Sequence, residues 1–279
     1  MMTLSKKRIP AQAANNVFSI ISDEKLLAIY STMLKCRMLK DRTRILLKGN
    51  RLNGSEYEAG NGEAAAAGVV IDLLPQDKVW SFPNDILPFF IKGLRLEKLF
   101  AQRLSEGASA SSNAEQLKLA IGAAVACKAN KDNKIVVIFR SGDGMNHGSW
   151  EEALKGAGVH SLPILFVSQG ALTPEPQSNS GRSRLKEKAY GLPAIAVEGN
   201  DAVAVYRVAS EAIGHARKGD GPTLIECQCL QAGDALLNME KYLIRKGLFS
   251  EKCKRQVEVG FIEELDAAMV MGEKASLGG

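Results

Sequence analysis

Short, almost continuously apolar runs alternate with helical patterns through the second half of the chain, and this alternation most restricts the fold. Four such runs occupy residues 134–139, 163–167, 194–197 and 222–229. Runs of this kind are typical of strands that are buried on both faces of a parallel sheet. Segments with helical character separate them. The sequence therefore predicts an α/β fold, a parallel sheet flanked by helices.

Helical periodicity predicts most of the remaining elements. A long helix is expected over residues 22–48, because Ser22 and Asp23 supply a start signal and apolar residues then recur at helical spacing. Further helices are expected at 62–74, 95–104, 114–128, 150–159, 185–190 and 201–217, with a short strand at 79–82. We expect one α/β domain over 1–279, with an N-terminal helical arm (about 1–50) and a C-terminal helical extension (about 236–271).

Composition excludes several classes of protein. With 46% hydrophobic and 24% charged residues, the chain is neither disordered, nor collagen-like, nor a disulfide scaffold. Aromatic residues make up 6%, and the net charge of +5 is spread along the chain, so no nucleic-acid partner is expected. No stretch approaches the ~20 apolar residues of a membrane span, and the N-terminus lacks the apolar run of a signal peptide. We therefore expect a cytoplasmic protein without a membrane partner.

The cysteines and histidines give no sign of a metal site. All five cysteines are expected to be reduced, buried thiols, at positions 36, 127, 227, 229 and 253. Cys227 and Cys229 alternate along an apolar run and so share one face of a strand. There is no Cys-x-x-Cys pair and there are only three histidines, so a zinc site is not expected.

One motif offers chemistry, the run Gly142-Asp143-Gly144 between a buried strand and a helix. Ligands of open α/β sheets bind beyond the carboxyl ends of the strands. Flanking glycines let the backbone approach a phosphate, and the following helix directs free N–H groups at an anion. An aspartate at this point can hold a divalent metal that bridges two phosphates. A plain turn carrying an aspartate fits the same residues, and both interpretations stay open.

Several segments in order resemble the alpha subunit of thiamine-diphosphate-dependent 2-oxo acid dehydrogenases, the family of the pyruvate and branched-chain enzymes. The similar segments lie at 120–128, 134–139, 142–144, 152–154, 162–167, 188–193, 197–201, 204–206 and 219–226. Upstream, Gly62-Glu63-Ala64 is similar to the family's Gly-Gln-Glu-Ala. The resemblance covers about residues 24–226 and implies a thiamin-diphosphate-binding-type fold.

The resemblance also implies a function. It implies oxidative decarboxylation of a 2-oxo acid, with acyl transfer to a lipoyl arm and with the hard chemistry supplied by thiamine diphosphate. In the family the aspartate of Gly-Asp-Gly binds the Mg²⁺ of the cofactor, a role that maps to Asp143, while Gly142 and Gly144 supply backbone. A beta-type dehydrogenase subunit is the implied partner, in an α2β2 heterotetramer, or the chain forms a homodimer. Alanine-rich helices suit such packing between subunits.

The chain departs from the family at the site itself. Ser168-Gln169-Gly170-Ala171-Leu172 replaces the family's second metal motif, Glu-Asn-Asn-Gly-Tyr, which leaves Gln169 as the candidate cofactor contact. The segment 82–85 lacks the arginine of the family's Tyr-Arg-x-His, the segment 105–113 replaces a Ser-Met-His loop, and no histidine follows His215. These losses favour weak binding of the cofactor, or none.

Three functions therefore stay open, and we leave undecided whether the chain is an active enzyme. It is a dehydrogenase alpha subunit, a catalytically degenerate homologue (a pseudoenzyme) that serves as scaffold or regulator, or a pocket for another phosphate-bearing ligand. His147 and Glu63 are the catalytic candidates, although each also fits an exposed residue. Arg140 fits a substitute anion partner or a solvated strand end. His160 is expected at a helix end and His215 at the surface.

Overall fold

The structure, a computed structural model, describes residues 21–49, 62–82, 85–105, 113–141, 147–172, 191–230 and 233–277. Its centre is a five-stranded sheet in the order β1-β2-β3-β5-β4. The strands are β1 (Lys78–Phe82), β2 (Val136–Ser141), β3 (Ile164–Leu172), β4 (Ala194–Glu198) and β5 (Thr223–Leu230). Every neighbouring pair is parallel, which confirms the predicted α/β fold.

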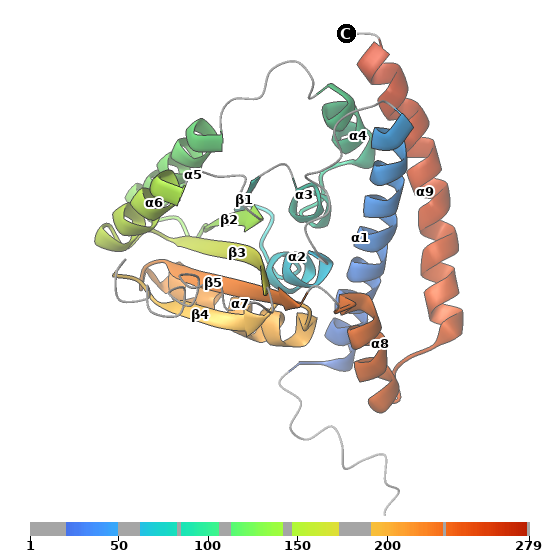
Figure 1. The fold of residues 1–279 in the computed structure, drawn as a ribbon. Helices are drawn as coiled ribbons and strands as arrows, with labels where there is room; N and C mark the ends of the chain where they lie inside the picture. Colours follow the sequence, from blue (N-terminus) through green and yellow to red (C-terminus); the bar gives the residue numbers. More distant parts are fainter. Residues whose placement is uncertain are drawn as a thin grey trace, which may run out of the picture.

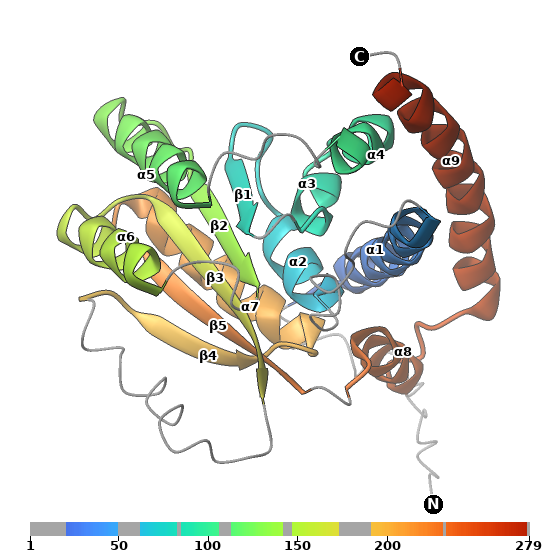
Figure 2. The same cartoon turned by 45° about the horizontal axis from the view of Figure 1, so that its top comes forward.

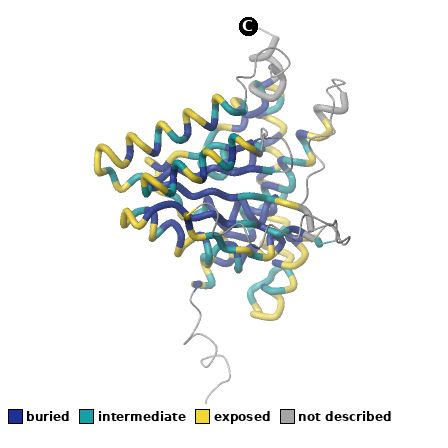
Figure 3. The backbone as a smooth tube through the Cα atoms, turned by 60° about the vertical axis from the view of Figure 1, so that its left-hand side comes forward, coloured by how far each residue is buried: buried dark blue, intermediate teal, exposed yellow. Residues whose placement is uncertain are grey.

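The central strands are buried because helices cover both faces of the sheet (Figure 2). Val136 and Ile138 of β2 face α5 (Asn113–Ala129) and α6 (His147–Val159). Val137 and Phe139, on the other face, pack against α2 (Glu63–Val70) and α7 (Ala202–Lys218). The continuous apolar run of β2 follows from this double cover. In Figure 3 the buried residues of the strands are the dark blue stretches in the middle of the molecule.

Helix α2 packs unusually close to its neighbours. All eight of its residues are buried, and a Cβ added at Gly68 would lie 2.8 Å from Val205 Cγ1 of α7. The four alanines therefore serve packing inside this chain. Our expectation that alanine-rich helices meet another subunit is wrong for α2, since none of its residues reaches the surface. The helix also ends at Val70, earlier than predicted.

A second, all-helical layer lies beside the sheet (Figure 1). The long helices α1 (Asp23–Gly49) and α9 (Glu251–Leu277) run side by side, and α4 (Leu96–Ser105) packs on α9. The predicted C-terminal helical stretch is two helices, α8 (Ala235–Arg245) and α9. The short α3 (Leu87–Ile91) was not predicted, because five residues with a proline in the first turn carry no helical period.

The sequence signals at the two ends of α7 correspond to its observed caps. Asp201 is its N-cap, and Asp201 Oδ1 accepts hydrogen bonds from the backbone N–H groups of Val203 at 2.9 Å and Ala204 at 3.0 Å. Gly219 ends the helix with a φ of 84°, the left-handed conformation that glycine adopts readily. The predicted helix at 185–190 lies outside the described residues.

Four of the five cysteines are buried as expected, but Cys253 is exposed on α9, so the prediction of a buried thiol is wrong there. Residues 251–256 at the beginning of α9 are exposed apart from Lys254, which is partly buried, so this end of the helix leaves Cys253 to solvent. Within the described ranges, no helix is both long and apolar enough to cross a membrane.

Candidate functional site

The carboxyl ends of β2 and β3 place two polar side chains side by side. Ser141 and Gln169 are partners in the β2–β3 register, and both lie on the sheet face that α2 covers. Ser141 Oγ and Gln169 Nε2 are buried, and neither has a hydrogen-bond partner in the described part of the chain. A buried donor without a partner costs about 1–3 kcal/mol. This pair therefore marks a place that suits a polar ligand group.

The turn that precedes α2 closes on the same amide. A Cβ added at Gly62 would lie 2.9 Å from Gln169 Oε1 and 3.8 Å from Asp85 Oδ2. Contacts below 3.0 Å are too short for a real Cβ, so glycine lets this turn approach Gln169 without displacing it. The amide of Gln169 thus lies between the end of β3 and the beginning of α2.

Glu63, the first residue of α2, is fully buried and carries a charge. Arg37 of α1 donates two hydrogen bonds to Glu63 Oε1, one of them from Nε at 2.9 Å and the other from Nη2. Lys40, one turn further along α1, holds its Nζ 3.8 Å from Glu63 Oε2. A buried carboxylate requires such cationic partners. The alternative that Glu63 is an exposed glutamate is therefore wrong.

Arg37 also reaches a third helix. Its Nη2 lies 3.0 Å from Asp234 Oδ1 and its Nη1 3.3 Å from Asp234 Oδ2, and Asp234 is the N-cap of α8. Burial opposes the charge of Arg37, but the hydrogen bonds to Asp234 and Glu63 outweigh this and raise the pKa of the guanidinium. The same contact with Arg37 lowers the pKa of Asp234. Arg37 thus ties α1, α2 and α8 together beside Gln169.

Arg140 immediately precedes Ser141 but projects from the other face of β2. Its side chain is 8% exposed, and its guanidinium lies over the ring of Trp150 in α6, with 5.5 Å between Cζ and the ring centroid. The alternative of a solvated strand end is therefore wrong, since an aromatic face replaces water around this cation. The role of Arg140 as an anion partner stays a prediction.

The other site residues predicted from the sequence are the glycine motif and the three histidines. Gly142, Asp143 and Gly144 lie outside the described residues, and so does the side chain of His147, the first residue of α6. The flanking elements are described: β2 ends at Ser141 and α6 begins at His147, the predicted strand-to-helix junction. His160, after α6, and His215, in the last turn of α7, are exposed.

Sequence reasoning missed Arg37, Lys40 and Ser141. Arg37 and Lys40 occur in a helix with ordinary charged positions, and nothing local distinguishes them. Ser141 adjoins the glycine motif, and its position at a strand end was the available signal. The described ranges contain no cluster of three or more His, Cys, Asp or Glu side chains suited to a metal ion, and Asp143, the predicted metal ligand, is not among them.

Comparison with known proteins gives consistent results. A family model described as "Dehydrogenase E1 component" matches residues 102–234. The alpha subunit of acetoin:2,6-dichlorophenolindophenol oxidoreductase from Bacillus subtilis is 30% identical, over 74% of this chain and 70% of the relative. The pyruvate dehydrogenase E1 component subunits alpha of Acholeplasma laidlawii and Staphylococcus aureus are 29% and 27% identical, over 73% and 85% of this chain and 71% and 75% of theirs.

Proposed function

We propose a function from one premise: this chain belongs to the dehydrogenase E1 component family. It is the alpha chain of a thiamine-diphosphate-dependent 2-oxo acid dehydrogenase and works with a separate beta-type chain, in an α2β2 assembly of the cytoplasm. The observation that carries the proposal is the pair of buried donors, Ser141 Oγ and Gln169 Nε2, at the strand ends where Gly142-Asp143-Gly144 follows.

The described residues fit the diphosphate end of the cofactor. The hydroxyl of Ser141 and the amide of Gln169 each have a hydrogen to donate, and diphosphate oxygens accept hydrogen bonds. Gly62 keeps the beginning of α2 close to this place. Glu63 would repel an anion, but Arg37 and Lys40 balance its charge. Asp143 would hold the Mg²⁺ of the cofactor, whose charge would offset that of the diphosphate.

In this proposal the residues described at the site bind the cofactor or position one another. Thiamine diphosphate, when bound, supplies the electron sink for decarboxylation of the 2-oxo acid. Ser141 and Gln169 bind anionic oxygen, and the turn at Gly62 fixes the orientation of the Gln169 amide. Glu63, whose Oε1 is engaged by Arg37, is a positioning residue rather than a proton carrier. No general acid or base is assigned to this chain, which agrees with a site completed by a partner.

Calorimetric titration of Mg²⁺ and thiamine diphosphate into the full chain, alone and with its beta-type partner, tests the proposal. We expect saturable binding that Asp143→Ala abolishes and Asp220→Ala, an exposed change at the far end of α7, leaves unaltered. Absence of heat in both samples would overturn the assignment as an enzyme. Cofactor-independent binding of the partner would then identify the chain as a non-catalytic scaffold.

A further inference from the structure

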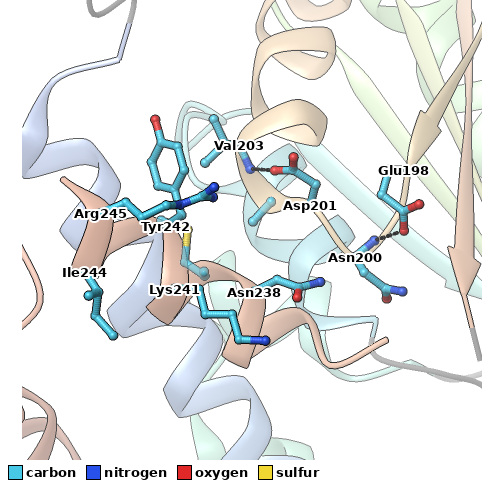
Figure 4. Close-up of a pocket in the computed structure, with 11 residues that line it drawn as sticks. Glu198, Asn200, Asp201, Val203, Asn238, Lys241, Tyr242, Ile244 and Arg245 are labelled. Carbon is cyan, nitrogen blue, oxygen red and sulfur yellow. Dashed lines mark hydrogen bonds between the residues drawn. The ribbon is translucent and has the colours of Figure 1, made fainter. Parts of the chain in front are cut away.

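A separate pocket lies at the β4 edge of the sheet, between the carboxyl end of β4, the N-terminus of α7 and α8 (Figure 4). Its volume is about 580 Å³, within the range of pockets that enclose small molecules. Apolar atoms of Val203, Met239 and Tyr242 line part of it, and Met239 itself is buried. The proposed cofactor site uses other strand ends, so this pocket has no role assigned so far.

The walls of this pocket carry opposite charges. Glu198 and Asp201 come from the end of β4 and the cap of α7, whereas Lys241 and Arg245 project from α8 (Figure 4). Lys241 and Arg245 are four residues apart, and so share one face of the helix. Within the part of the chain that the structure describes, no ion pair joins the two walls within 4.0 Å. The space between them separates the charges.

Contacts within the protein hold most of these groups in place. Glu198 Oε1 accepts a hydrogen bond from the Asn200 backbone N–H at 3.2 Å, and Asp201 is fixed by its capping bonds. Arg245 lies beside the ring of Tyr242, with 6.0 Å between Cζ and the ring centroid. Lys241 is exposed and has no hydrogen-bond or ion-pair partner among the described residues. The pocket lining therefore includes an anchored carboxylate, Glu198, and an ammonium group, Lys241, that has no partner among the described residues.

We propose that this pocket binds a free α-amino acid with an apolar side chain. The ligand carboxylate contacts Lys241, its ammonium contacts Glu198, and its side chain packs against Tyr242 and the edge of the core at Val203 and Met239. A ligand with a single charge would meet one wall of like sign, and that repulsion gives selectivity for a zwitterion. Asn238, which lies beside Lys241 in Figure 4, adds an amide that suits either ligand group. The proposal does not depend on the proposed dehydrogenase function.

Three probes of similar shape separate the charges: L-leucine, 3-methylbutylamine, which lacks the carboxylate, and 4-methylpentanoate, which lacks the ammonium. Each is titrated into the full chain carrying ¹³C-methyl methionine, with the Met239 methyl signal assigned through Met239→Leu. We expect saturable displacement of the Met239 signal by L-leucine, at least about tenfold tighter than by either single-charge probe. The other methionine signals report that the fold is unchanged.

Variants of the two walls complete the test. Lys241→Met should lower the affinity for L-leucine to that of 3-methylbutylamine for the unaltered chain. Glu198→Gln should lower it to that of 4-methylpentanoate. Lys252→Met, an exposed change on α9 outside this pocket, should have no effect. The proposal is overturned if L-leucine leaves the Met239 signal unmoved at millimolar concentration, if a single-charge probe binds equally well, or if both wall variants bind like the unaltered chain.

Discussion

Arg37 and Glu63 join α1 to the beginning of α2 through two hydrogen bonds that one carboxylate oxygen accepts. The two residues are 26 positions apart, and Glu63 is completely buried. The contact fixes the turn at Gly62, which in turn packs on Gln169 at the end of β3. An ion pair between two helices thus sets the position of a side chain in the proposed cofactor site.

Replacement of Arg37 by methionine should destabilise the chain by about 3 kcal/mol. The substitution leaves the Glu63 charge buried without its main partner, and breaking such a pair typically costs about 3–5 kcal/mol. We expect the lower end because Lys40 remains 3.8 Å away. Urea unfolding measures the effect. The double variant Arg37→Met/Glu63→Gln should lose less than the sum of the single variants, whereas additive losses would show that the pair is not coupled.

Asp234 should make folding stability sensitive to acid. Arg37 lowers the pKa of Asp234 from its ordinary 3.8, so the folded state binds that proton less readily than the unfolded chain. The resulting stabilisation is present above about pH 4 and is lost as the pH falls through the lowered pKa. Urea midpoints measured across this acid range should fall less steeply in Asp234→Asn, which retains a capping side chain. An unchanged acid slope would contradict the prediction.

Two glycine substitutions should separate cofactor binding from stability. In Gly62→Ala the new Cβ meets the side-chain amide of Gln169, which can turn aside by rotation, so we expect weaker thiamine diphosphate binding at little cost in stability. In Gly68→Ala the Cβ meets Val205 and the backbone N of Tyr206 at 3.0 Å, so we expect about 1–3 kcal/mol of destabilisation without a change in affinity. Calorimetric titration and thermal unfolding of both variants decide the matter. Equal effects on affinity would remove the proposed role of Gly62.

The sheet was predictable because burial on both faces leaves a direct record in the sequence. Each residue from Val136 to Phe139 has zero exposure, and a run of apolar side chains is what that position demands. The cap at Asp201 was equally readable, since its hydrogen bonds reach only two and three residues along the chain. Local geometry and local sequence agree at both places.

The contacts of the site were not predictable in the same way. The Arg37–Glu63 pair depends on how α1 packs against α2, and no periodicity encodes which charged residue of a helix turns inward. The alternative of a solvated strand end at Arg140 was wrong for a related reason. A charged residue at a strand end is usually solvated, but Trp150 of α6 covers this one from another element. Both cases are decided by tertiary packing rather than by residue type.

An asparagine at Gly170 should leave cofactor binding unchanged. Gly170 stands near the place of an asparagine in the family's second metal motif, and a Cβ added there would meet no atom within 4 Å. Neighbouring residues of a strand project from opposite faces, so a side chain at 170 lies on the face away from Ser141 and Gln169. We therefore expect Gly170→Asn to bind Mg²⁺ and thiamine diphosphate like the unaltered chain in calorimetric titration, and Gly170→Ala, which adds a Cβ but no oxygen, to do the same. A gain of about tenfold in Gly170→Asn alone, the effect of one added charge-assisted contact, would contradict this and show that the amide oxygen reaches the metal.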